Sequence, residues 1–246
     1  MFSNINQQGI FKCLNYAFPP NSLKYCGPND KTRELLEYAK IKKADLGLAE
    51  LIKKFEILYP YLQLIAHENN IVDPFDEKVV EGYWIGNEFL ENITIKNFYT
   101  HLIEKQNITK KVSKKEFNWL MKKIPIGGLP HHTFHVLNIF KGVQNKSAEN
   151  ILNTMDSCRI SVGKVIELEP QIGVMVKPLH VINNKLCLGK PVKKNIISPI
   201  AEKKNIQLGC YVSIHWNAFC EVLSQEQVKN LNKYTKLAID LANTTI

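Results

Sequence analysis

The segment from Pro130 to His135 carries three of the seven histidines of the chain. His131 and His135 are four positions apart, so on a helix their side chains share one face and can bind one metal ion. Pro130 suits the first turn of such a helix. No glutamate stands between the two histidines, so this is not the zinc-protease pattern. One hypothesis is therefore a metal-binding protein or enzyme centred on His131 and His135, and the alternative is a structural role for both.

Six cysteines are spread along the chain without a Cys-x-x-Cys pair, at positions 13, 26, 158, 187, 210 and 220. This spacing argues against a zinc ribbon. The sequence also lacks a phosphate-binding P-loop, the dinucleotide-binding Gly-x-Gly-x-x-Gly pattern and the Gly-x-Ser-x-Gly pattern of hydrolases. The sequence therefore favours a protein that is not an enzyme.

The elements that must position these residues differ between the two parts of the chain. From Thr32 to Tyr59 the apolar residues recur at helical spacing, and Gly47 marks a break or a position of close packing near the middle of this stretch. A polar stretch near residues 143–154 predicts a domain boundary. We therefore predict an all-α domain over residues 1–150.

After Asp156 the pattern changes to short apolar runs separated by turn residues, which is typical of a small β-barrel. The run from Tyr211 to Trp216 is a clear strand candidate. Ser224 and Gln227 then form the capping-box pattern that opens a helix. The predicted fold is α+β, in which the helical domain precedes a small OB-like barrel with a C-terminal helix over residues 155–246.

The formal net charge is +9, but the lysines are scattered in pairs and form no long basic run. This distribution favours a solvated surface over a nucleic-acid interface. No apolar run approaches the roughly 20 residues of a membrane span, and no basic leader precedes an apolar block. We expect no membrane partner, a cytoplasmic protein and reduced thiols.

Two segments of the predicted barrel carry a family resemblance. The first runs from Cys158 to Val165, with a glycine five positions after the cysteine and an apolar residue two further on. The second runs from Gly209 to His215, a Gly-x-Tyr-Val strand that ends in a histidine and leads into an apolar stretch and a Gln-rich helix. In this order they resemble the HypC/HupF chaperones of hydrogenase maturation, over about the last 90 residues.

This resemblance implies a HypC-like barrel that carries an iron–cyanide–carbonyl fragment. Its protein partners would be the precursor of a [NiFe]-hydrogenase large subunit or other maturation proteins. Cys158 and His215 stand at the matching positions and would be the metal ligands, because a thiolate suits low-spin iron and a neutral imidazole is a second donor. The alternatives are that Cys158 is a structural thiol and that His215 is a hydrogen-bonded strand residue.

The whole chain also resembles a bacterial family of unknown function. Three short motifs carry this second resemblance: Tyr16–Asn21, Tyr25–Pro28 and Pro130–His135. It implies no activity. The sequence therefore leaves two hypotheses from different classes, a metal-centre assembly chaperone and a metal-binding protein or enzyme at the Pro130–His135 segment.

Overall fold

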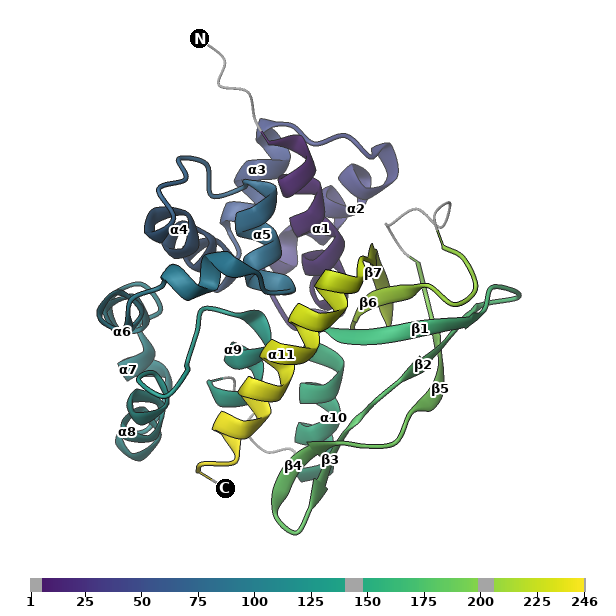
Figure 1. Cartoon of the computed structure of the whole chain (residues 1–246). Coiled ribbons are helices and arrows are strands. Elements are labelled where there is room, and N and C mark those ends of the chain that lie inside the picture. The colour runs from purple at the N-terminus through teal and green to yellow at the C-terminus, as the bar shows by residue number, and fades with distance from the viewer. Residues whose placement is uncertain (1–5, 140–147, 199–205, 246) are drawn as a thin grey trace. The chain divides into compact units, whose positions relative to one another are not determined.

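The computed structural model describes residues 6–139, 148–198 and 206–245. The chain divides into two compact units, Met1–Pro125 and Ile126–Ile246. The polar residues 144–147, at which the sequence suggested a boundary, lie outside the described residues. The mixed α and β content agrees with the predicted class, since helices come first and antiparallel sheets and a long helix follow (Figure 1).

The described part of the first unit contains only helical elements and their connections. Its α-helices are α1 (Gln7–Ser22), α2 (Thr32–Ile41), α3 (Leu46–Lys53), α4 (Leu58–Glu68), α5 (Glu77–Trp84), α6 (Ile95–Glu104), α7 (Ile108–Lys111) and α8 (Lys114–Lys123). Two 3-10 helices join them, η1 (Asn29–Lys31) and η2 (Glu88–Asn92). Large rings fill the core, where Tyr16 stacks on Trp84 and Tyr61 stacks on Tyr83.

The break expected near Gly47 lies a few residues earlier. The helix α2 ends where Lys42 adopts the left-handed conformation with φ 52°, which closes a helix in the usual way. The next helix begins after Asp45, whose carboxylate accepts a hydrogen bond from the backbone N–H of Leu48. Gly47 is a position of close packing, the second of the two expected roles, because a Cβ there would stand 2.3 Å from the hydroxyl oxygen of Tyr38.

The second unit contains helices α9 (His132–Asn138), α10 (Ala148–Cys158) and α11 (Gln225–Ala242) and seven strands. The strands are β1 (Ser161–Glu167), β2 (Ile172–Val176), β3 (Leu179–Ile182), β4 (Lys185–Leu188), β5 (Val192–Ile196), β6 (Tyr211–His215) and β7 (Ala218–Leu223). Five of them form an antiparallel sheet in the order β5-β2-β1-β6-β7, and β3 and β4 form a separate hairpin.

The prediction of a barrel is wrong, because the sheet is not closed. In the described residues its edge strands β5 and β7 meet only at the bridge between Ile197 and Ala218. Two backbone hydrogen bonds make this bridge, from Ile197 N to Asn217 O at 2.9 Å and from Phe219 N to Ile197 O at 2.8 Å. A closed barrel needs a continuous ladder between its edges. The sheet is therefore open and bent, with its edges touching at one corner.

One face of the sheet forms the core of the second unit, which includes Val165, Val174, Val212 and Phe219. The long helix α11 begins at the predicted capping box, in which Ser224 and Gln227 satisfy each other's backbone N–H groups. It packs against α9 and lies beside β1 (Figure 1).

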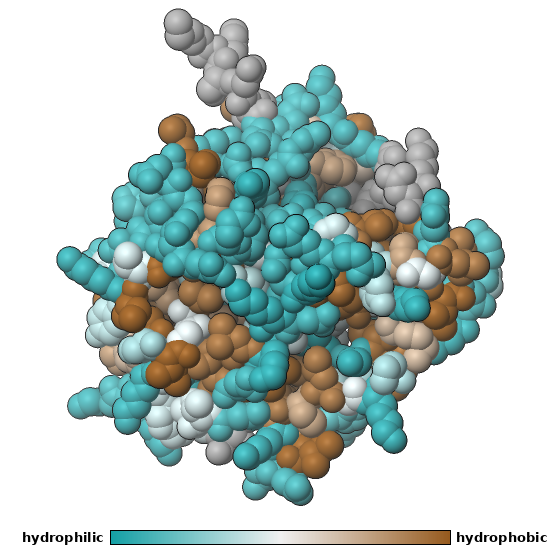
Figure 2. All heavy atoms as spheres, viewed as in Figure 1, coloured by the Kyte–Doolittle hydropathy of each residue, from teal (hydrophilic) through white to brown (hydrophobic). Residues whose placement is uncertain are grey.

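Most side chains on the face shown in Figure 2 are hydrophilic, with smaller hydrophobic groups between them. Among the helices in the described ranges, none combines the length and the apolar composition that a membrane span requires.

Candidate metal centre

Three donor side chains of the second unit converge where three elements begin or end. His132 is the first residue of α9, Cys158 is the last of α10, and His215 is the last of β6. Their ligand atoms all lie within 4.8 Å of one another. The imidazole rings of His132 and His215 meet edge to face, with centroids 5.0 Å apart and an interplanar angle of 78°.

The pairing of β1 with β6 brings Cys158 to His215. Ser161 stands opposite Ile214 in this ladder, so the residues before β1 run beside the residues after β6. A backbone hydrogen bond of 2.8 Å from Trp216 N to Ser157 O extends the contact. Backbone hydrogen bonds fix this contact, so the register of the sheet brings Cys158 close to His215.

His132 is tied to the same point by its own ring. Its Nε2 lies 2.8 Å from the carbonyl oxygen of Cys158 and 4.0 Å from Cys158 Sγ. A carbonyl oxygen only accepts hydrogen bonds, so Nε2 donates and carries the proton in this state. A metal ion bound at Nε2 would replace this hydrogen bond.

The spacing of the donors suits a transition metal after a small closure. Zinc–sulfur bonds near 2.3 Å and zinc–nitrogen bonds near 2.0–2.1 Å place tetrahedral donors roughly 3.3–3.6 Å apart. The separation of 4.0 Å between Cys158 Sγ and His132 Nε2 exceeds that range by less than 1 Å. All three donors lie within 4.8 Å of one another, so side-chain rotations that draw them together by roughly 1 Å would let the three residues hold one ion and leave a fourth ligand position.

The surroundings of His132 favour the neutral form that binds metals. His132 and His215 are buried, at 7% and 1% exposure. Burial lowers the pKa of His132 to about 4, so its ring is neutral at pH 7. Cys158 is only half-buried and is the donor nearest to solvent.

The same geometry argues against a cysteine nucleophile activated by His132. A general base must accept the thiol proton, so Nε2 would first have to release the hydrogen bond that it donates to Cys158 O, as it would for a metal ion. The lowered pKa of His132 also disfavours an imidazolium that would stabilise a thiolate. The arrangement fits a metal ligand set better than a catalytic dyad.

His131 and His135 are not in the cluster. His131 is the N-cap of α9, where its Nδ1 accepts a hydrogen bond from Thr133 N, and its ring stacks on Tyr234 of α11 with centroids 5.2 Å apart. His135 is buried one turn further along the helix. No group of three donors found in the described residues includes either histidine.

Sequence reasoning missed His132 because it selected the pair with helical spacing. The helix begins at His132, and His131 precedes it in extended backbone, so His131 and His135 do not share one helical face. The face of His131 therefore meets α11, while the ring of His132 reaches Cys158. The local signal for His132 was the run of histidines in which it stands. Its partner Cys158 lies 26 residues further along the chain, where no local pattern points to it.

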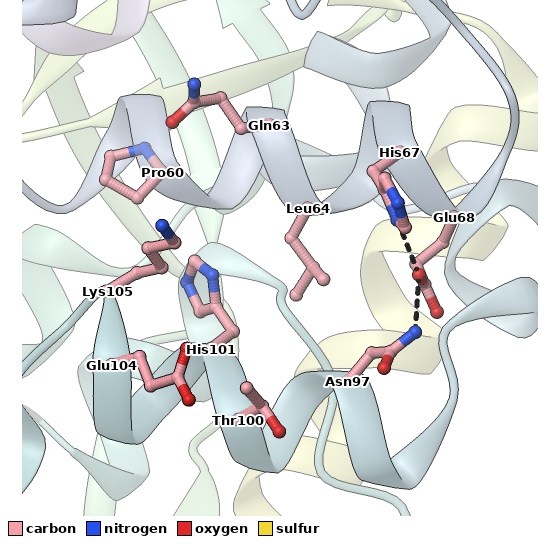
Figure 3. A pocket seen from close by; sticks show the side chains of 10 residues that line it. All are labelled: Pro60, Gln63, Leu64, His67, Glu68, Asn97, Thr100, His101, Glu104 and Lys105. Atoms are coloured by element: carbon pink, nitrogen blue, oxygen red, sulfur yellow. Dashed lines mark hydrogen bonds and ion pairs between the residues drawn. The ribbon is translucent and has the colours of Figure 1, made fainter.

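A second concave surface lies in the first unit between α4 and α6, with a volume of about 280 Å³ (Figure 3). At one end Glu68 Oε1 accepts hydrogen bonds from His67 Nδ1 at 2.9 Å and from Asn97 Nδ2 at 2.8 Å. Further along, Glu104 and Lys105 add one charge of each sign. The mixture of charges in this groove specifies no ligand class.

The fold and the site together define a mixed α and β protein with a buried His–Cys–His donor cluster in its C-terminal unit. The chain matches the family of unknown function DUF6390 over residues 6–246 and belongs to this family. Comparison with curated proteins and with solved structures finds no match.

Proposed function

We propose that this protein is a metal-binding accessory protein whose C-terminal unit holds one transition-metal ion or fragment on His132, Cys158 and His215. The observation that carries this proposal is the convergence of the three donor atoms within 4.8 Å. Two of the three residues, Cys158 and His215, stand at the positions that resemble the HypC/HupF motifs.

The donor set suits a metal that is carried and handed on. One thiolate and two imidazoles suit borderline and soft ions such as Zn²⁺, Cu⁺ and Fe²⁺. With three protein ligands, a fourth position stays open for an exogenous ligand or for a donor of a partner protein. The half-buried Cys158 is the ligand through which a partner would reach the metal.

The cargo we propose is iron that bears cyanide and carbon monoxide, delivered to the precursor of a [NiFe]-hydrogenase large subunit. This part rests on the resemblance of the last 90 residues and on the suitability of a thiolate for low-spin iron. The alternative, a metal-binding protein or enzyme centred on His131 and His135, has weaker support. The same segment supplies a donor, but that donor is His132.

Metal binding is tested by anaerobic titration of the full chain with Co²⁺, which reports a cysteine ligand through a thiolate charge-transfer band. We expect one ion per chain, with loss of the band in Cys158→Ala. His132→Asn and His215→Asn should each weaken binding by about 100-fold or more, since even groups that only orient ligands are worth 10–100-fold.

Cys187→Ala is the matched control, because Cys187 is also half-buried but lies in the separate β3–β4 hairpin. It should bind Co²⁺ like the wild type. Equal binding by Cys158→Ala and the wild type would overturn the metal site.

The cargo is tested separately. The protein is purified anaerobically from a host that makes a [NiFe]-hydrogenase, then measured by infrared spectroscopy and by mass spectrometry of co-purifying proteins. Cyanide and carbonyl stretching bands that disappear in Cys158→Ala would support the iron fragment. A metal-loaded protein without these bands would overturn the hydrogenase role and leave the metal site standing.

A further inference from the structure

The sheet of the second unit has a second face, opposite to its core. Tyr211, Lys164 and Met175 stand directly opposite one another in the neighbouring strands β6, β1 and β2. Paired residues share a face of a sheet, and so do residues two apart in one strand. Val162 and Lys177 therefore extend the same face, while Val165 and Val174 point into the core.

The helix α11 covers part of this face and leaves a cavity. Val228, Asn232 and Thr235 are spaced four and three residues apart, so they share one side of the helix. Between them and the strands lies a cavity of about 350 Å³, which the residues around β4 complete with Leu188 and Pro191. Figure 1 shows α11 running beside β1.

The cavity is positively charged. Its lining contains Arg159, Lys164 and Lys177 and, in the described part of the chain, no acidic side chain. The buried Arg159 is fixed by Asp156, whose carboxylate balances its charge, and by the carbonyl oxygen of Lys177. The two lysines are exposed and form none of the ion pairs found among the described residues. In the parts of the chain that the structure describes, no carboxylate forms an ion pair with either lysine of this cavity.

The rest of the lining is apolar on the sheet side, through Val162 and Met175, with Leu188 beside them. Tyr211, Asn232 and Thr235 add groups that can form hydrogen bonds. A cavity of this size lies in the range of small-molecule sites, which combine apolar walls with a few placed polar groups. A charged surface alone would not supply the apolar wall.

We propose that this cavity binds a small organic anion, a carboxylate or a phosphate ester with an apolar portion. The anionic group would lie between Lys164 and Lys177, and the apolar portion would lie on Val162 and Met175. This site is distinct from the donor cluster and does not depend on it.

The test is isothermal titration of the full-length protein with four probes: phenyl phosphate, benzoate, inorganic phosphate and benzyl alcohol. We expect one saturable site for phenyl phosphate or for benzoate, and the stronger of the two identifies the anionic group. Inorganic phosphate lacks the apolar portion and benzyl alcohol lacks the charge, so each should bind at least tenfold more weakly. Equal binding of either of these two would overturn the proposal, as would the failure of both aromatic anions to bind.

Variants locate the site. Lys164→Gln and Lys177→Gln should each weaken binding roughly tenfold, the effect of one charged hydrogen bond. Lys185→Gln and Lys229→Gln remove exposed lysines of the same unit that do not line the cavity, and they should change binding less than twofold. Cys158→Ala should also bind normally, which separates this site from an anion held by a metal. A loss in the control variants equal to that in Lys164→Gln would overturn the assignment.

Discussion

We expect the first unit to lose stability at mildly acidic pH, because it contains the buried His101. His101 is 5% exposed, its ring lies 4.9 Å from that of Tyr61, and its Nε2 lies 3.3 Å from Gln106 Nε2. Burial, with a smaller contribution from Lys105, lowers the pKa of His101 from 6.5 to about 4. Between these two pKa values the unfolded chain binds a proton at this position and the folded chain does not.

The sign follows from this difference. Stability rises with pH wherever the unfolded state binds more protons, so the contribution of His101 is intact above pH 6.5 and is lost as the pH falls towards 4. A difference of about 2.5 pKa units, at 1.36 kcal/mol each, gives a loss of roughly 3 kcal/mol from this residue. That is a large part of the stability of a small unit.

The assay is urea unfolding between pH 7 and pH 4.5, followed by tryptophan fluorescence in a Trp216→Phe background, so that the signal comes from Trp84 and Trp119 of the first unit. Carboxylates also titrate in this range, so the quantity of interest is the difference between His101→Gln and its parent. His101→Gln should start less stable at pH 7 and lose about 2–3 kcal/mol less on acidification. Tyr99→Phe, a change at an exposed residue of the same helix α6, is the matched control and should keep the pH slope of the parent. The same pH slope in His101→Gln and in the parent would refute the reasoning.

Two further predictions concern the second unit. Asp156→Asn leaves the guanidinium of Arg159 buried without its carboxylate and weakens the hydrogen bond from Leu179 N. Urea unfolding should therefore show that the free energy of unfolding falls by roughly 3 kcal/mol. A fall below about 1 kcal/mol would mean that Arg159 does not need this charge. Gly163→Ala places a Cβ 2.6 Å from Ile214 Cδ1 and 3.1 Å from Val174 Cβ, so it should cost about 1–3 kcal/mol. Gly209→Ala, whose Cβ would meet no atom within 4 Å but whose φ is +85°, is the comparison for backbone strain alone.

Local signals predicted the local features of the fold. The capping box at Ser224 depends on residues three positions apart, and the helix begins there. The run predicted as a strand from Tyr211 to Trp216 is observed as β6, from Tyr211 to His215. Such features need only short-range spacing, which one sequence contains.

The errors arose where distant residues decide the outcome. Closure of the sheet depends on whether β5 and β7 pair along their length, and no local pattern encodes the single bridge at Ile197. The helix α10, from Ala148 to Cys158, is an element that the polar composition of this stretch did not predict. Its polar composition resembles a linker, but its end is held by Asp156 and Arg159 through contacts with residues 177 and 179.

Four consecutive residues at the junction of α10 and β1 connect the features on which both proposals depend. Asp156 fixes Arg159 and the start of β3, and Ser157 O accepts the hydrogen bond from Trp216 N that holds the end of β6. Cys158 supplies the sulfur of the donor cluster, and Arg159 lines the cationic cavity.

The metal cluster and the cavity are therefore separate in chemistry but share one backbone segment. Asp156→Asn, which touches neither proposed ligand directly, should change both binding reactions. It should weaken Co²⁺ binding by loosening the segment that carries Cys158, and it should alter anion binding because it removes the carboxylate that balances the charge of Arg159. Lys164→Gln and His215→Asn should each affect only one of the two. A variant at Asp156 that changed neither binding reaction would show that the junction is not needed to position Cys158 and Arg159, and that each site is held by its own strand contacts.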